Sequence, residues 1–510
     1  MTVPEWYRRN GWKFALILAL LAASGVTLYS ASMTPRYDRW QYPVWYLSEY
    51  LLTTGTLPTC SQVSADMLPV WTGKACLRIG TPGHPVSVAT FTALTGLDFT
   101  GPFKRWFVFT PLLKLSAGYL LVAQFAKART SRILGTAIIY LSPDYSTLYL
   151  TTAKGLSFSL LLFSVYFLVK TLREDFRWSL LYLLSFVLLL EYYVPRSVLV
   201  VVFAAVVAHF LLADRKIVRS LILVYNTVFA LYFFQADLFG EYYRIIAGAV
   251  EPGLLAAITA ERASIPFFEP SSGLGWILLL PLGTLGAVGG LLALREKGVP
   301  FLADERMLWL YSLVIGYLPA GLLLPFFRTR LFFEAAIPGL LVAADRCDLE
   351  SVGRYMRSGV AVSILILVVG YSLTLSGAVG YGPQYDSLAD TMTDADVREE
   401  EIVFTDMKTG AYLVGENRHL NTTMLTDGGN RERIGAVWYY SDADAACRIM
   451  SDRESDYFVL REDVRTQGVP VMNYDRVPAP ESALEKYRDS PRYDRVIDAW
   501  EFDVYELNAC

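Results

Sequence analysis

The sequence predicts a polytopic α-helical membrane protein of about eleven transmembrane helices with a small C-terminal α+β domain. Hydrophobic residues make up 54% of the 510 residues and charged residues only 18%, which is too apolar for one soluble domain. Apolar runs near the length of about twenty residues that crosses roughly 30 Å of hydrocarbon recur up to residue 380. The remaining residues, 381–510, are clearly more polar.

Eleven apolar runs, bounded by polar or charged residues, are candidate membrane spans. They are 14–30, 106–126, 133–150, 156–169, 180–193, 197–212, 217–236, 274–294, 307–327, 331–344 and 359–378. The first run could instead be a signal peptide, because Arg8 and Arg9 precede a compact apolar core. An uncleaved anchor is favoured, because the run is long enough to span and ten further runs follow it.

Basic residues predict the orientation of the spans, because lysines and arginines near helix ends are retained on the cytoplasmic side. They cluster at alternate connections: 8–13, 127–132, 170–177, 215–219, 295–306 and 346–357. This alternation predicts a cytoplasmic N-terminus and an extracytoplasmic C-terminus. The transmembrane domain is then 1–380, with outer loops at 31–105 and 237–273, and 381–510 is an extracytoplasmic domain.

The C-terminal domain combines short β-like runs with helical patterns. The runs 402–404, 457–460 and 500–507 predict strands, and 442–452 and 481–490 predict helices. These patterns predict that residues 381–510 form a small α+β domain.

Charge and metal-ligating residues exclude two classes of function. The net charge of −4 gives no basic field for a nucleic-acid backbone. The three histidines, His84, His209 and His419, are scattered without HExxH or CxxC spacing, so a histidine-based metal centre is not expected.

Four of the five cysteines lie in predicted outer segments, where oxidising conditions permit disulfides. Cys60 and Cys76 share the first loop, and Cys447 and Cys510 share the C-terminal domain. These pairs could form two bridges, of which Cys60–Cys76 is the favoured one, with Cys347 left over on the inner side. Free thiols throughout are the alternative.

The first outer loop carries an ordered series of features. Asp38 follows the first span, a helical stretch from Tyr42 ends in a Gly55-Thr56-Leu57-Pro58 turn, and a second one after Pro85 ends in Leu94-Thr95-Gly96-Leu97. Two further motifs lie at the predicted spans that follow: the third span ends in Leu141-Ser142-Pro143, and the fourth begins after Lys154-Gly155. In this order the features resemble the GT-C fold membrane glycosyltransferases, with archaeal members, including relatives of oligosaccharyltransferases, looking most similar.

The resemblance implies an enzyme that takes a sugar from a polyprenyl phosphate carrier such as dolichyl phosphate. A hexosyl- or mannosyltransferase-like activity toward a glycan, lipid or protein acceptor of the cell envelope is expected, with Mg²⁺ or Mn²⁺ as a candidate cofactor. The family's acidic residue in the first loop carries over to Asp38 as the base or metal-positioning acid. Asp38 has an alternative role, because Asp38-x-x-Gln41 has the form of a helix capping box.

A phosphate leaving group needs positive charge near it. Three arginines are predicted to lie on the outer side of the membrane, against the general preference of basic residues for the cytoplasmic side: Arg196, Arg328 and Arg330. They are therefore candidates for binding the phosphate of the lipid carrier. Lys114 lies within a predicted span, where an ionisable side chain is a functional candidate. Snorkelling to ordinary headgroups is the alternative for the arginines, and structural pairing is the alternative for Lys114.

Three further acids are candidates for a second acid or metal ligand: Asp144, Glu191 and Glu261. The first two could instead neutralise Lys154 or Arg196. Glu261 ends an Ile258-Thr259-Ala260-Glu261 fragment that is similar to the TIxE element of oligosaccharyltransferases.

The fragment 438–442, Trp-Tyr-Tyr-Ser-Asp, lacks the WWDYG order of oligosaccharyltransferases. This departure favours transfer of a single sugar over transfer of a whole oligosaccharide to asparagine. A lipid-linked glycan translocase, or a scaffold whose outer domain binds a partner, is the non-enzymatic alternative.

Overall fold

The computed structural model describes part of the chain, which falls into two compact units. The described residues are 21, 41–66, 75–76, 78–96, 100–141, 153–192, 200–201, 204, 220, 224, 228, 337, 341, 345, 388, 392, 397–398, 401–406, 409–410, 413, 422–424, 433, 435–462, 464, 479–498 and 502–508. The first unit is drawn from Met1–Met33, Gly80–His84 and Phe103–Val379, and the second from Thr34–Ile79, Pro85–Pro102 and Gly380–Cys510.

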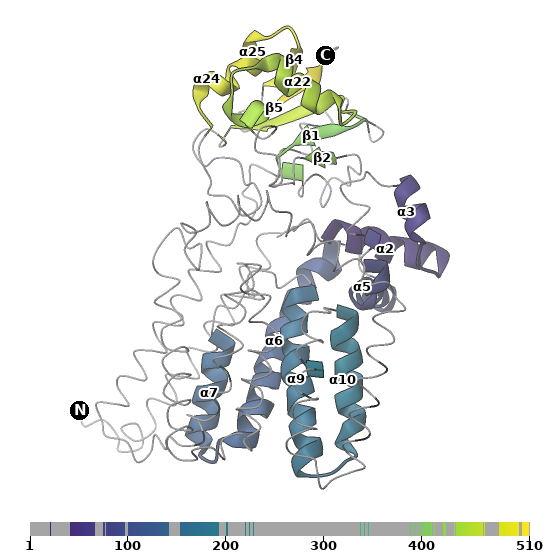
Figure 1. The fold of residues 1–510 in the computed structure, drawn as a ribbon, viewed down its shortest axis with the longest axis vertical. Coiled ribbons are helices and arrows are strands. Elements are labelled where there is room, and N and C mark those ends of the chain that lie inside the picture. The colour runs from purple at the N-terminus through teal and green to yellow at the C-terminus, as the bar shows by residue number, and fades with distance from the viewer. Residues whose placement is uncertain are drawn as a thin grey trace, which may run out of the picture. The chain divides into compact units, whose positions relative to one another are not determined.

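The first unit contains a group of apolar helices (Figure 1). They are α6 (Thr100–Phe125), α7 (Arg129–Leu141), α9 (Ala153–Arg173) and α10 (Trp178–Tyr192). These helices correspond to four of the predicted spans, 106–126, 133–150, 156–169 and 180–193, although residues 142–150 of the second of these lie outside the described residues. The other seven spans lie outside the described residues or are represented only by isolated positions. Within the described part, Leu156–Arg173 is the one stretch both long and apolar enough to cross a membrane.

The helices of this unit pack closely at specific points. Helices α9 and α10 lie along one another (Figure 1). A Cβ on Gly118 of α6 would lie 3.3 Å from a methyl group of Ile139 on α7, so glycine lets these two helices approach. At the end of α9, the Arg173 guanidinium donates to the Gln124 carbonyl at 3.0 Å and lies over the Phe125 ring at 4.6 Å.

One face of α10 exposes aliphatic side chains. Leu180 is 67% exposed and Leu184, one turn later, is 55% exposed. Tyr182 and Phe186 on another face are buried. An apolar face open to the surroundings at helical spacing is typical of a helix that contacts lipid.

Three helices of the first predicted outer loop are described: α2 (Gln41–Thr54), α3 (Cys60–Asp66) and α5 (Gly83–Thr95). Helix α2 confirms the helical stretch predicted from Tyr42. Both predicted glycine turns are present, since Gly55 has φ 75° and Gly96 has φ 64° directly after the helix ends. Glycine adopts this left-handed conformation without the steric cost of a Cβ.

The C-terminal domain, which belongs to the second unit, is built on a five-stranded mixed sheet in the order β2-β1-β3-β5-β4. Its strands are β1 (Val403–Thr405), β2 (Thr422–Met424), β3 (Tyr457–Arg461), β4 (Tyr493–Asp498) and β5 (Phe502–Leu507). Strands β2, β1 and β3 run parallel, whereas β5 is antiparallel to both β3 and β4.

Hydrophobic clusters cover both faces of this sheet, since successive side chains of a strand point to opposite faces. Phe404 and Phe458 pack in one cluster with α22 (Ala443–Ser451), the π-helix η3 (Gly435–Tyr439), α24 (Glu481–Leu484) and α25 (Lys486–Asp489). Val403 and Val459 pack in the other with Leu388, Met392 and Leu413. Every residue of β1 and β3 is buried as a result.

Candidate functional site

Lys114 of α6 is a buried cation within the helical unit. It is 5% exposed, and its ammonium lies 5.5 Å from the centre of the Phe158 ring on α9. Thr110, one helical turn earlier on the same face of α6, is also buried, at 1%. Desolvating a lysine is costly, so a lysine at this depth is expected to serve a charged partner or ligand.

The start of α5 lies against the end of α10. A Cβ on Gly83 would lie 2.8 Å from Cβ of Glu191 and 3.1 Å from the Tyr192 ring, closer than side chains tolerate. His84, which is 1% exposed, stacks on the Tyr192 ring with the two centres 5.9 Å apart. Glycine at position 83 therefore allows the start of α5 to approach the end of α10, where His84 stacks on Tyr192.

Tyr192 packs with Leu156 of α9 in a small hydrophobic cluster, and Leu113, which precedes Lys114 in the sequence, packs against the same cluster. His84, Thr110, Lys114, Glu191 and Tyr192 are called the polar cluster from here on. These buried or half-buried polar side chains of α5, α6 and α10 belong to one compact unit.

The polar cluster contains the groups needed to hold an anion. A lysine ammonium acts as a point charge toward phosphate, and an imidazole can donate a hydrogen bond to it. Low local polarity strengthens both interactions. The carboxylate of Glu191 adds a group that can accept a proton or offset positive charge.

His84 was not among the site residues expected from the sequence, although His84-Pro85 lies in the loop that carries the resemblance. A lone histidine in a sequence gives no sign of its partners. Gly83 is the sequence feature that could have pointed to His84, since a glycine in a helical stretch often marks a close approach of another segment of the chain.

The first loop contains a disulfide between Cys60, the first residue of α3, and Cys76, with their Cα atoms 5.2 Å apart. Cys447 of α22 is also disulfide-bonded and fully buried. Cys510, the partner expected for Cys447, lies outside the described residues.

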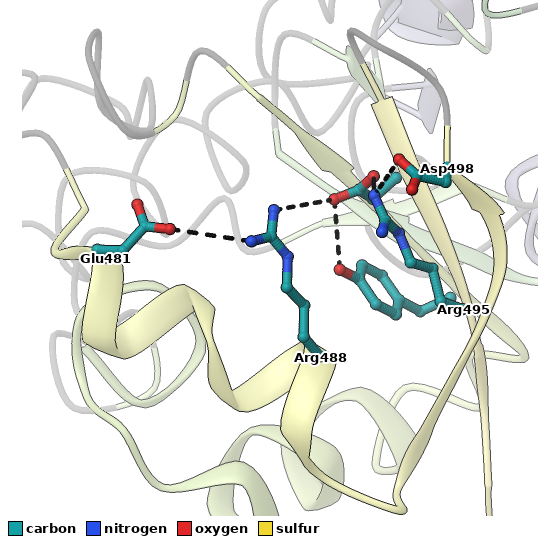
Figure 2. Close-up of polar contacts among 6 residues, drawn as sticks. Glu481, Arg488, Arg495 and Asp498 are labelled. Carbon is teal, nitrogen blue, oxygen red and sulfur yellow. Dashed lines mark hydrogen bonds and ion pairs between the residues drawn. The ribbon is translucent and has the colours of Figure 1, made fainter.

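A second set of charged residues lies in the C-terminal domain (Figure 2). Arg488 of α25 and Arg495 of β4 both approach the carboxylate of Asp503, whose side chain is only 5% exposed. Arg488 also lies 4.0 Å from Glu481, Arg495 pairs with Asp498, and the Tyr505 hydroxyl donates to Asp503 at 3.3 Å. Burial raises the pKa of Tyr505 to about 12, and the Asp503 carboxylate adds to this rise. The set joins α24 and α25 to the β4–β5 hairpin.

Of the site residues expected from the sequence, Lys114 and Glu191 fall in the polar cluster. Asp38, Asp144, Arg196, Glu261, Arg328 and Arg330 lie outside the described residues. Helix α2 begins at Gln41, three residues after Asp38. Within the described ranges, no three histidine, cysteine or acidic side chains gather as a metal site.

No family model matches the chain, and no curated protein matches its sequence. Solved structures do match. The oligosaccharyltransferase of Archaeoglobus fulgidus tethered to an acceptor peptide aligns over 91% of this chain and 70% of its own, with a TM-score of 0.55 and 12% identity. The archaeal oligosaccharyltransferase AglB from the same organism, in complex with an inhibitory peptide and a dolichol-phosphate, aligns over 90% of this chain and 70% of its own, with a TM-score of 0.50 and 11% identity.

ArnT from Cupriavidus metallidurans in the apo state aligns over 97% of this chain and 98% of its own, with 13% identity and a TM-score of 0.48. The shared fold rests on the two archaeal alignments. The chain shares the polytopic membrane fold of these GT-C fold proteins, so the predicted resemblance to the GT-C fold is confirmed. The number of about eleven membrane spans stays a prediction.

Proposed function

We propose that the chain is a membrane glycosyltransferase that takes a sugar from a polyprenyl phosphate carrier and transfers it to an acceptor outside the membrane. The observation that carries this proposal is a buried lysine and histidine, Lys114 and His84, in a chain with the GT-C fold. AglB, which shares that fold, was solved with a dolichol-phosphate bound. A buried cationic site suits the phosphate of such a carrier.

The catalytic roles follow from the charge changes of the reaction. An acceptor hydroxyl that attacks the anomeric carbon loses its proton to a base, and we assign that base, or a metal-positioning acid, to Asp38. The phosphate that leaves carries negative charge, and Lys114, Arg196, Arg328 and Arg330 stabilise it in this proposal. These lysine and arginine side chains would stabilise the phosphate whether or not a metal ion is bound.

The second acid and the metal belong to the same proposal. Glu191, Asp144 and Glu261 are the candidates for accepting a proton or binding Mg²⁺ or Mn²⁺. In the proposed topology the N-terminus is cytoplasmic, and the domain from residue 381 is extracytoplasmic, where it covers the site or selects a glycan, lipid or protein acceptor.

Trp438, the first residue of the fragment 438–442, is a core residue of the C-terminal domain. Trp438 is 2% exposed and packs 5.5 Å from the Phe458 ring, centre to centre, within the core of the C-terminal domain. A side chain buried in this way stabilises the domain and is not available to a peptide. The fragment 438–442 therefore gives no support to recognition of an asparagine acceptor.

Transfer of radiolabelled sugar from polyprenyl phosphate by the purified protein in lipid vesicles tests the proposal. Native transfer that is lost in Asp38→Asn and weakened in Arg328→Gln supports the enzyme and both roles, provided that all three proteins are equally folded. Asparagine keeps a capping oxygen but removes the charge, so full activity of Asp38→Asn rejects the catalytic role. No transfer from any carrier favours a translocase or a scaffold.

A further inference from the structure

The π-helix of the C-terminal domain is held by one buried amine. In η3 and the residue that follows it, called here the Gly435–Tyr440 turn, the Tyr440 amide donates to the Gly435 carbonyl at 2.7 Å. The Nζ of Lys486 on α25 donates to the carbonyls of Ala436 and Tyr440, at 2.5 and 2.7 Å. The hydroxyl of Tyr487 donates to the Val437 carbonyl between them.

A π-helical turn is uncommon and persists where its surroundings over-determine it. Here two consecutive residues of α25 satisfy three carbonyls of the turn. The turn is also sterically tight, because a Cβ on Gly435 would lie 2.6 Å from the Tyr440 ring. Tyr440 itself is 55% exposed, so the turn presents an aromatic ring at the surface of the domain.

The chemistry of Lys486 is unusual for a lysine. It is 6% exposed, and both of its hydrogen bonds to the turn go to neutral carbonyls. A neutral amine has two N–H donors, which match these two carbonyls, whereas an ammonium adds a third donor and a charge in a desolvated place. Burial lowers the pKa of Lys486 to about 7, and the Asp442 carboxylate only partly opposes this.

We propose that Lys486 is a proton-controlled latch, whose neutral amine holds the Gly435–Tyr440 turn closed and whose protonation favours an open turn with the lysine in water. The proposal goes beyond sugar transfer and does not depend on it. It assigns a pH-sensitive surface element to the C-terminal domain.

The other titratable groups around the latch have partners of their own or titrate elsewhere. Asp444 of α22 pairs with Arg492 at 3.0 Å, and Glu481 of α24 lies 4.0 Å from Arg488. Tyr493 of β4 donates to the Ala443 carbonyl at 3.1 Å, and burial raises its pKa far above neutrality. Burial also raises the pKa of Tyr487, whose ring centre lies 4.9 Å from the Lys486 Nζ. Asp442 is the carboxylate that acts on the amine, and it caps α22 by accepting from the Ala445 amide at 2.9 Å.

The direction of the effect follows from proton linkage. The closed turn binds fewer protons than the open one, because the amine has a pKa of about 7 when closed and its ordinary value of 10.5 in water. Raising the pH therefore favours the closed turn. Between these two values the ratio of open to closed falls about tenfold for each pH unit gained, and below the lower value it is constant.

Hydrogen exchange of the full-length protein in lipid nanodiscs tests the latch. The measured quantity is the protection factor of amides in residues 435–440, which removes the intrinsic effect of pH on exchange. We expect it to rise about tenfold per pH unit from pH 7 to 9 in the native chain. Amides of β3 should not show this slope, because the sheet does not open with the turn.

Variants identify the group responsible. Lys486→Met should abolish the slope, and so should Lys486→Arg, which stays charged throughout this range. Asp489→Asn, which removes an exposed charge from the same helix, should retain the slope. Four results would overturn the proposal: a flat profile in the native chain, a slope that survives in Lys486→Met, a slope that is lost in Asp489→Asn, or an equal slope in β3.

Discussion

Gly83 and Glu191 lie so close that a single methyl group at position 83 would come within 2.8 Å of the Glu191 Cβ. The contact joins the first residue of α5 to the end of α10. It also places His84 on the Tyr192 ring. The geometry of the polar cluster thus depends on the absence of a side chain.

Gly83→Ala is expected to push Gly83 and His84 away from the end of α10 and to disturb the polar cluster. The methyl group meets the Glu191 backbone carbon at 3.2 Å as well as its Cβ, and neither atom can move as a flexible side chain would. Overpacking of this kind costs about 1–3 kcal/mol. Thermal unfolding in detergent and sugar transfer are the measurements.

Gly55→Ala is the matched control, since its new methyl group meets nothing within 4 Å and only its φ of 75° is unfavourable. A backbone effect of this kind costs about 1 kcal/mol. If Gly55→Ala destabilises the protein as much as Gly83→Ala does, the close contact of Gly83 is not important.

Lys114→Met is expected to lower sugar transfer about tenfold to a hundredfold with little loss of thermal stability. The loss corresponds to one charge-assisted hydrogen bond, about 1.5–3 kcal/mol. Methionine keeps the packing against Phe158 while removing the charge. The measurement is kcat/KM for the lipid-linked donor in vesicles.

Lys170→Met provides the comparison. Lys170 lies near the other end of α9 from Phe158, pairs with Glu174 and lies 5.1 Å from the Trp178 ring. A surface pair of this kind contributes about 0.3–0.5 kcal/mol, so transfer should be near native. Equal losses in both variants, or a parallel fall in melting temperature for Lys114→Met, would give Lys114 a structural role instead.

Replacing Cys60 and Cys76 by serine should destabilise the first loop by about 3 kcal/mol, because the bridge closes a loop with a sequence separation of 16. Proteolysis of the loop should accelerate accordingly. Cys347→Ser, which touches neither of the two expected bridges, should change nothing. Peptide mapping without reductant must recover Cys60 and Cys76 in one linked species, and two free thiols there would remove the bridge.

Asp503→Asn should destabilise the C-terminal domain by about 2–4 kcal/mol. The carboxylate is buried between Arg488 and Arg495, and asparagine leaves both guanidinium groups without their shared negative partner. Asp498→Asn removes a carboxylate from the same arginine, but its side chain is 72% exposed, so its effect should stay within about 0.5 kcal/mol. Hydrogen exchange of the β5 amides measures the loss of stability in both variants. Equal losses would show that the burial of Asp503 between the two arginines adds no stability.

Several features of the fold could be predicted from local sequence. Four apolar runs correspond to α6, α7, α9 and α10, because spanning a bilayer requires long apolar helices. The positions of β3 and α22 were predicted within about one residue from apolar periodicity. The two glycine turns after α2 and α5 followed from the conformational freedom of glycine.

Other features were not accessible in this way. Strand β2 is only three residues long and is defined by its pairing with β1, so its own sequence gives a weak signal. The π-helix depends on Lys486 and Tyr487, about 50 residues further along the chain. For the site, Lys114 stood out as a charge within an apolar run, whereas His84 is recognisable only by what surrounds it.

The sequence by itself determined the membrane class, the positions of α6, α7, α9 and α10, and the resemblance of the first loop to the GT-C enzymes. These depend on composition and on spacing along the chain, which local physical chemistry governs. Only the tertiary structure decided that Gly83 adjoins Glu191, that His84 stacks on Tyr192 and that Lys486 bonds to the Gly435–Tyr440 turn. Such contacts join residues far apart in sequence, and their energies come from burial and close packing that exist only once the chain has folded.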